Sequence, residues 1–228
     1  MKGYQSTIFL WSIAISYFAQ SQEVLPQPIL EIHQSAKFFE VDQLNQIYIV
    51  TPQDQLIKYD VTGKQLFDFS DQTLGDLTHI DVTDPFNVLL YYADYQNIVL
   101  LDRTLSIPRQ LSLLDLDLVN VNAVGLSRDN HIWVYDNNVF RLKKYNAQGQ
   151  LLAQSADLSL LLNTTLNPIH LKEVDGQVYL NDPAVGLILF DLFGQYISTI
   201  GIRELENYQI IDEQLAYRVG ETIRVYNL

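Results

Sequence analysis

The chain has 228 residues, of which 14 are Lys or Arg and 27 are Asp or Glu, and it contains no cysteine. Because 48% of the residues are hydrophobic and 11% are aromatic, the composition fits one globular domain and excludes a disordered, collagen-like or disulfide-rich chain. The absence of thiols excludes a cysteine nucleophile, and the excess of carboxylates argues against nucleic acid as a partner.

The first 21 residues have the pattern of a secretory signal peptide. Lys2 is their only charged residue, residues 8–18 form an apolar run, and small residues precede a cleavage point before Gln22. A membrane anchor and a buried first strand are the alternatives, but the run is shorter than the roughly 20 residues that cross a bilayer. We therefore expect an exported mature domain, residues 22–228, with no transmembrane segment.

The lack of disulfides in an exported domain favours one compartment over others. Small secreted domains of eukaryotes usually contain disulfides, whereas many bacterial envelope proteins fold without them. The sequence therefore predicts a location in the periplasm or at the cell surface of a Gram-negative bacterium.

A short phrase recurs through the rest of the chain about every 42 residues. It places alternating apolar and aromatic residues after a turn residue, and its central positions are Tyr48, Leu90, Trp133, Tyr179 and, more weakly, Ala216. A second apolar phrase follows each copy by about ten residues, so each pair of phrases predicts a β-hairpin.

Three of the second phrases end in a turn signal. Asp or Asn is followed three residues later by Gly, as in Asp60 and Gly63, Asn146 and Gly149, and Asp191 and Gly194. This pattern is typical of a type I turn that ends in a glycine with positive φ. The remaining copy has Leu105 in place of the glycine after Asp102, and we expect it to turn differently.

With the flanking apolar segments, each repeat contains four expected strands in about 42 residues. A β-propeller blade has the same number of strands and a similar length. The sequence therefore predicts an all-β, five-bladed propeller of four-stranded antiparallel blades. The fifth repeat reaches the C-terminus before its fourth strand, so residues 29–33 are expected to complete the last blade and close the ring. An open β-solenoid is the alternative, but solenoids have shorter periods.

Carboxylates provide the one candidate for metal or acid–base chemistry. Asp42, Asp84 and Asp129 lie near the junction of the first and second strands of successive repeats. A ring could bring them to one mouth of the channel, where they would bind Ca²⁺ or act as an acid/base pair. Asp is also a favourable turn residue at such junctions, so a purely structural role is the alternative.

The hairpin of the second repeat is rich in tyrosine, and four of its residues are candidates for an exposed recognition patch: Tyr91, Tyr92, Asp94 and Tyr95. The four histidines show no metal-binding spacing and are expected in turns or on strand surfaces. No nucleophile elbow, phosphate-binding loop or dinucleotide fingerprint is present, so no catalytic residue is assigned.

Several phrases resemble the repeats of small exported bacterial β-propeller proteins with NHL-like repeats. They are residues 57–60, 181–183 and 190–194. The resemblance covers nearly all of the expected mature chain and implies the propeller fold and a platform that binds a protein or ligand. It carries no catalytic residue over, although some propellers of similar shape are calcium-dependent lactonases.

The expected function is that of a non-catalytic module that binds another envelope protein, as a monomer or as a subunit of a hetero-complex. Its binding surface would include residues 91–95 and 106–120. One version is a soluble subunit of an outer-membrane secretion or transport complex. The alternatives are a calcium-dependent hydrolase or lactonase that uses channel carboxylates, and a propeller that captures a small carbohydrate on aromatic residues.

Overall fold

A computed structural model describes residues 30–205, 208–211 and 213–228. The chain divides between Glu31 and Ile32, and the architecture below is that of the part from Ile32 onward. The expected signal peptide, residues 1–21, lies outside the described residues. No helix in the described ranges is both long and apolar enough to cross a membrane.

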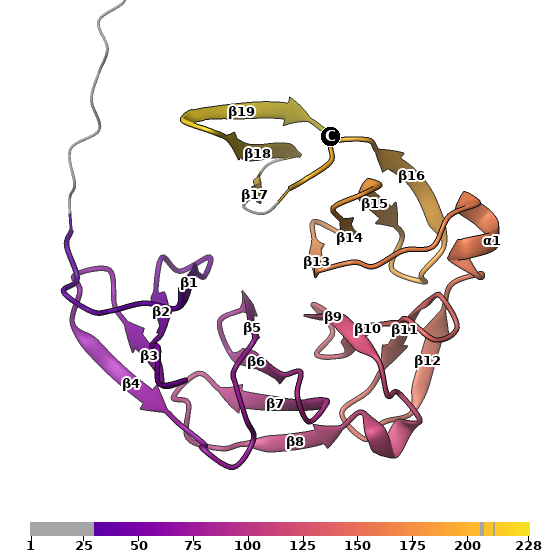
Figure 1. The fold of residues 1–228 in the computed structure, drawn as a ribbon. Coiled ribbons are helices and arrows are strands. Elements are labelled where there is room, and N and C mark those ends of the chain that lie inside the picture. Colours follow the sequence, from indigo (N-terminus) through magenta and orange to yellow (C-terminus); the bar gives the residue numbers. More distant parts are fainter. Residues whose placement is uncertain (1–29, 206–207, 212) are drawn as a thin grey trace, which may run out of the picture. The chain divides into compact units, whose positions relative to one another are not determined.

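Five antiparallel sheets follow one another along the chain (Figure 1). Within each sheet, consecutive strands are hydrogen-bonded neighbours. The first sheet contains β1 (Phe38–Val41), β2 (Ile47–Val50), β3 (Leu56–Tyr59) and β4 (Gln65–Phe69). The second contains β5 (His79–Asp84), β6 (Asn87–Tyr92), β7 (Asn97–Asp102) and β8 (Arg109–Ser112). The third contains β9 (Val121–Leu126), β10 (Ile132–Asp136), β11 (Arg141–Tyr145) and β12 (Leu151–Gln154). The fourth contains β13 (His170–Val174), β14 (Gln177–Asp182), β15 (Gly186–Phe190) and β16 (Tyr196–Ile200). The fifth contains β17 (Tyr208–Ile211), β18 (Gln214–Val219) and β19 (Thr222–Asn227).

The first strands of the sheets lie around a common centre. Strand β1 contacts β5, β5 contacts β9, and β9 contacts β13, while β5 also contacts β13 from the fourth sheet. The approach of β9 to β13 is so close that a Cβ added to Gly125 would lie 2.6 Å from the carbonyl oxygen of Leu171. The predicted all-β, five-bladed propeller is therefore confirmed.

The central residues of the repeats pack between neighbouring sheets. Tyr48, Leu90 and Trp133 are fully buried, and Tyr179 is nearly so. Large side chains at this position fill the wedge between two blades, which is the packing that the spacing of about 42 residues predicts.

The hairpin turns between third and fourth strands follow one geometry in all four complete sheets. Gly63, Gly149 and Gly194 have φ between 77° and 82°, as predicted. The expectation of a different turn at Asp102 was wrong, because Leu105 adopts φ of 56° and its N–H donates to the Asp102 carbonyl at 2.9 Å. Burial of the Leu105 side chain in the core offsets the strain of its left-handed backbone.

The N-terminal segment does not complete the fifth sheet as predicted. Residues 30–36 contain no strand, and among the described residues β19 pairs with β18 alone. The N–H of Gln34 donates to the Ile32 carbonyl at 2.9 Å, which turns the chain sharply. The Ile32 side chain packs against Ile49 and Ile57 of the first sheet, so apolar packing draws this part of the segment to the first sheet.

The two segments between repeats contain local structure of their own. Residues 106–120, expected to belong to the binding surface, include β8 and the short 3₁₀ helix η1 (Leu114–Leu116), so part of this segment completes the second sheet. Residues 156–167 include the short helix α1 (Leu158–Leu162). The Asp157 side chain caps this helix by accepting from the N–H groups of Ser159 and Leu160.

A buried carboxylate joins the third and fourth sheets. Glu173 of β13 is 1% exposed, and its oxygens accept from Trp133 Nε1 at 2.7 Å, from the Ser127 hydroxyl at 2.6 Å and from the Arg128 N–H at 3.0 Å. Three donors in a site shielded from water make this carboxylate an anchor between blades.

We predict that Glu173→Ala lowers the free energy of unfolding by about 3 kcal/mol, because three buried donors lose their acceptor. Urea denaturation followed by Trp133 fluorescence measures the change. The exposed Glu221 supplies the control, and Glu221→Ala is expected to change stability by less than about 0.5 kcal/mol. Equal effects of the two substitutions would contradict the role given to Glu173.

Candidate functional site

The predicted tyrosine patch is only half on the surface. The expectation of exposure was wrong for Tyr91 and Tyr92, which are 1% and 0% exposed. The side chains of Tyr91 and Tyr92 are buried because they pack between blades. The Tyr91 hydroxyl donates to the Val121 carbonyl of the next sheet at 2.7 Å. Asp94 and Tyr95 are exposed, and binding at these two residues stays a prediction.

Two of the three candidate metal ligands are engaged in their own turns. Asp42 is buried and accepts from the N–H groups of Leu44 and Gln46 and from the Tyr48 hydroxyl. Asp84 accepts from the Phe86 N–H and from the amide of Asn87.

The third candidate, Asp129, is paired with a lysine. Its carboxylate accepts from Lys144 Nζ at 2.9 Å. Burial works against the charged form of Asp129, but neighbours led by Ser127 and Lys144 outweigh it and hold the pKa of this carboxyl at about 2. In the part of the chain that the structure describes, no three His, Cys, Asp or Glu side chains gather to hold a metal ion. The calcium site stays a prediction.

Titratable side chains meet at the centre of the propeller instead. The rings of His79 on β5 and His170 on β13 have centroids 5.8 Å apart, and His170 lies edge-on to Tyr208 of β17 at 6.5 Å. Lys172 Nζ lies 3.9 Å from Glu40 Oε2. Both histidines begin strands and are partly exposed, in line with the expectation of strand-surface positions, but the sequence did not predict that the ring topology brings them together from separate sheets.

Burial controls ionisation in this central cluster. Desolvation lowers the pKa of His79 to about 4, against an opposing effect of Asp81, and the charges of His170 and Lys172 add to the lowering. The pKa of His170 is lowered by burial and by Lys172. Burial raises the pKa of Glu40, as does Asp81, while Lys172 lowers it. Both imidazoles are thus held neutral near pH 7.

We predict that the protein loses stability as the pH falls from about 6.5 to about 4. In this window the unfolded chain protonates His79 while the folded chain does not, so acid favours unfolding by up to about 3 kcal/mol. The raised pKa of Glu40 acts in the opposite direction. Urea denaturation at several pH values measures the net slope.

The variant His79→Gln isolates the contribution of the histidine, because Glu40 is present in both proteins. The difference in unfolding free energy between wild type and variant should shrink as the pH falls through this window. A difference that is constant from pH 7 to pH 4 would show that His79 titrates normally in the folded protein.

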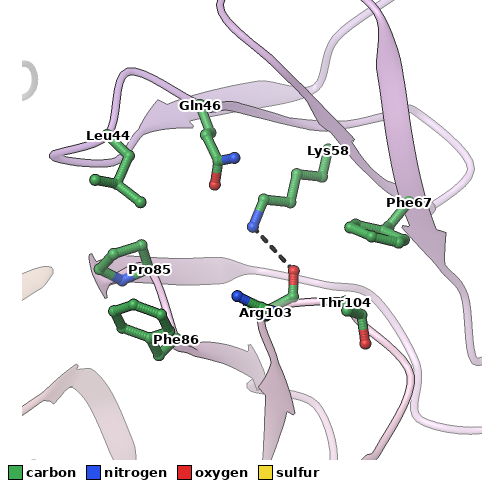
Figure 2. A pocket seen from close by; sticks show the side chains of 8 residues that line it. All are labelled: Leu44, Gln46, Lys58, Phe67, Pro85, Phe86, Arg103 and Thr104. Carbon is green, nitrogen blue, oxygen red and sulfur yellow. Dashed lines mark hydrogen bonds between the residues drawn. The ribbon is translucent and has the colours of Figure 1, made fainter.

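A pocket of about 300 Å³ lies between the first and second sheets (Figure 2). Leu44 and Gln46 come from the turn between β1 and β2, and Pro85 and Phe86 come from the turn between β5 and β6. The other lining residues are Lys58, Phe67, Arg103 and Thr104. Apolar side chains form most of the walls, and Leu44 and Phe86 are 52% and 58% exposed.

A buried ammonium group forms the polar end of this pocket. Lys58 is 2% exposed, its Nζ donates to the Arg103 carbonyl at 3.0 Å, and it lies 4.9 Å from the centre of the Tyr48 ring. Burial lowers the pKa of Lys58, Arg103 adds to the lowering, and Asp42 and Asp102 partly offset it. The site therefore favours any ligand that brings negative charge.

No lining residue of the pocket is acidic. Neither Lys58 nor Arg103 forms an ion pair with a carboxylate of the described residues. In a chain with a formal charge of −13, an apolar pocket with two cations and no carboxylate stands out from the remaining surface.

Reasoning from the sequence missed this pocket, because its residues come from three turns and two strands of two repeats. One signal was present. Lys58 is a charged residue in an otherwise apolar third strand, Leu56–Tyr59, where the pattern predicts buried apolar side chains.

No family model and no curated protein sequence matches the chain. Solved structures resemble it in fold. Virginiamycin B lyase from Staphylococcus aureus aligns at a TM-score of 0.54 and 12% identity, over 83% of this chain and 69% of the lyase chain. A protein of unknown function from Bacteroides caccae aligns at 0.54 and 11% identity, over 79% of this chain and 71% of that chain.

The WD40 β-propeller domain of Doa1 also aligns at a TM-score of 0.54, with 10% identity, over 79% of this chain and 60% of that chain. At these identities the similarity shows the fold alone. The family of the chain, including the expected NHL-like repeats, stays a prediction.

Proposed function

We propose that the chain is a non-catalytic propeller that binds another protein, and that the pocket between the first and second sheets is the centre of the binding surface. One observation carries the proposal: a concave, mostly apolar site contains two cations without an acidic partner. Sites of this kind, with an apolar body and a few polar anchors, are typical of recognition surfaces.

Exposed apolar side chains at the rim support a macromolecular partner. Phe86 and Leu44 are more than half exposed, and Phe67 is 37% exposed. An aromatic ring that stays in water in the free protein becomes buried when a partner covers it, which favours association. These residues lie in turns and an outer strand, where a partner can reach them without disturbing the propeller.

We further propose that the protein acts in the cell envelope. The signal-like first 21 residues, the excess of acidic residues and the lack of cysteine support an exported protein of a Gram-negative envelope. There the propeller would bind as a monomer or as a subunit of a hetero-complex, such as an outer-membrane secretion or transport complex.

We predict that a photo-crosslinking amino acid at position 86 forms a discrete adduct with a partner protein in cells that naturally make this chain. The same amino acid at Leu160 of α1, which is 80% exposed, serves as the control and should form no such adduct. Crosslinked products resolved by gel electrophoresis and mass spectrometry measure the outcome.

Competition tests whether the adduct at position 86 is specific. Excess purified wild-type protein, added to envelope extract, should suppress the adduct, whereas Phe86→Asp protein should not. Absence of an adduct at position 86, or the same adduct from both positions, would contradict a binding surface at the pocket.

A further inference from the structure

Two buried lysines occupy equivalent places in the first and third sheets. Lys58 pairs in register with Tyr48, and Lys144 pairs with Trp133, which are the central residues of their repeats. Each ammonium lies over the ring of its partner, at 4.9 Å and 5.0 Å respectively. The corresponding residues of the second and fourth sheets are Val99 and Leu189, so the lysines are exceptions within the repeat.

The two lysines differ in what neutralises them. Lys144 donates to the carboxylate of Asp129 at 2.9 Å. Within the described part of the chain, Lys58 donates to the backbone carbonyl of Arg103 alone, and no carboxylate there pairs with it. Buried charges in proteins are normally paired, so the first sheet lacks a partner that the third sheet provides.

The turns show where this missing carboxylate would be. Asn45 and Asn130 have φ of 58° and 61°, and their N–H groups donate to the carbonyls of Asp42 and Ser127, three residues earlier in each case. The two turns therefore align residue by residue, and Leu44 stands where the third sheet has Asp129. Leu44 lines the pocket.

We propose, building on the protein-binding function above, that the pocket binds the C-terminal residue of the partner. Its α-carboxylate takes the place that Asp129 holds beside Lys144 and binds Lys58, with Arg103 adding a second cation. Its apolar side chain packs against Leu44, Phe67 and Phe86 (Figure 2).

The chemistry of the pocket selects this occupant among carboxylates. Asp and Glu side chains bring a carboxylate without an apolar group, whereas an apolar C-terminal residue carries both on one α-carbon. A volume of about 300 Å³ suits one or two residues of a peptide better than a folded surface. C-terminal carboxylate capture is a known mode of peptide recognition.

Fluorescence anisotropy tests the proposal with fluorescein-labelled pentapeptides that end in Leu or Phe. Peptides with a free C-terminal carboxylate should bind the full chain, and the same peptides with a C-terminal amide should bind at least about tenfold more weakly, because a charge-assisted hydrogen bond is lost. Peptides that end in Gly with a free carboxylate should also bind about tenfold more weakly, because the apolar side chain is absent.

The variant Leu44→Asp gives the sharpest test, because it installs the carboxylate that the third sheet already has. We expect it to fold with unchanged or higher stability, since Lys58 gains a partner, and to lose peptide binding by at least about tenfold. Leu44→Asn has similar size without the charge and removes the same apolar contact, so a loss of binding that is clearly larger in Leu44→Asp than in Leu44→Asn measures the effect of the added carboxylate.

The variant Lys58→Leu removes the cation and introduces the residue found at the corresponding position, Leu189. It should fold and lose the difference between free and amidated peptides. The exposed Lys64 supplies the charge-matched control, and Lys64→Leu should keep that difference.

Two results would overturn the inference: equal binding of free and amidated peptides, or wild-type affinity of the Leu44→Asp variant. If no peptide binds while the adduct at position 86 forms, the C-terminal inference fails and the protein-binding function stands.

Discussion

Packing of one sheet against the next is the constraint on which the whole structure depends. A single four-stranded sheet buries little by itself, and the chain obtains its core by placing Tyr48, Leu90, Trp133 and Tyr179 between blades. Polar groups trapped in these contacts must find partners on the neighbouring sheet, as Glu173 does with three donors of the third sheet. Hydrogen bonds of this kind fix how one blade sits on the next, which apolar packing alone does not.

The same constraint explains which parts of the fold could be predicted from the sequence. Burial of a central residue in every blade imposes a repeat on the sequence, so the number of sheets and the order of strands follow from the spacing of Tyr48 and its counterparts. The turn at Leu105 could not be predicted, because the free energy that holds a leucine at positive φ comes from its burial in the tertiary core. Packing of Ile32 on the first sheet is likewise a tertiary preference that local alternation of apolar residues does not reveal.

Sites were harder to predict than strands because they combine residues from separate repeats. Tyr91 and Tyr92 have the composition of a recognition patch, and only their position between blades shows that they are core residues. His79 and His170 are far apart in the sequence, and the ring brings their imidazoles together. For the pocket, alignment of the repeats one with another would have shown that Leu44 replaces Asp129 while the lysine is retained.

Retention of Lys58 without its carboxylate has an energetic consequence. A buried ammonium with one backbone acceptor and one aromatic ring is less stabilised than the paired Lys144, and a leucine in its place would remove the desolvation penalty altogether. The fourth sheet shows that leucine fits this position. The unpaired Lys58 at the end of the open apolar pocket makes the folded protein less stable. A carboxylate from a bound partner would pair with this cation and recover the lost stability. On this account the lysine serves recognition, and the surrounding propeller holds it in place.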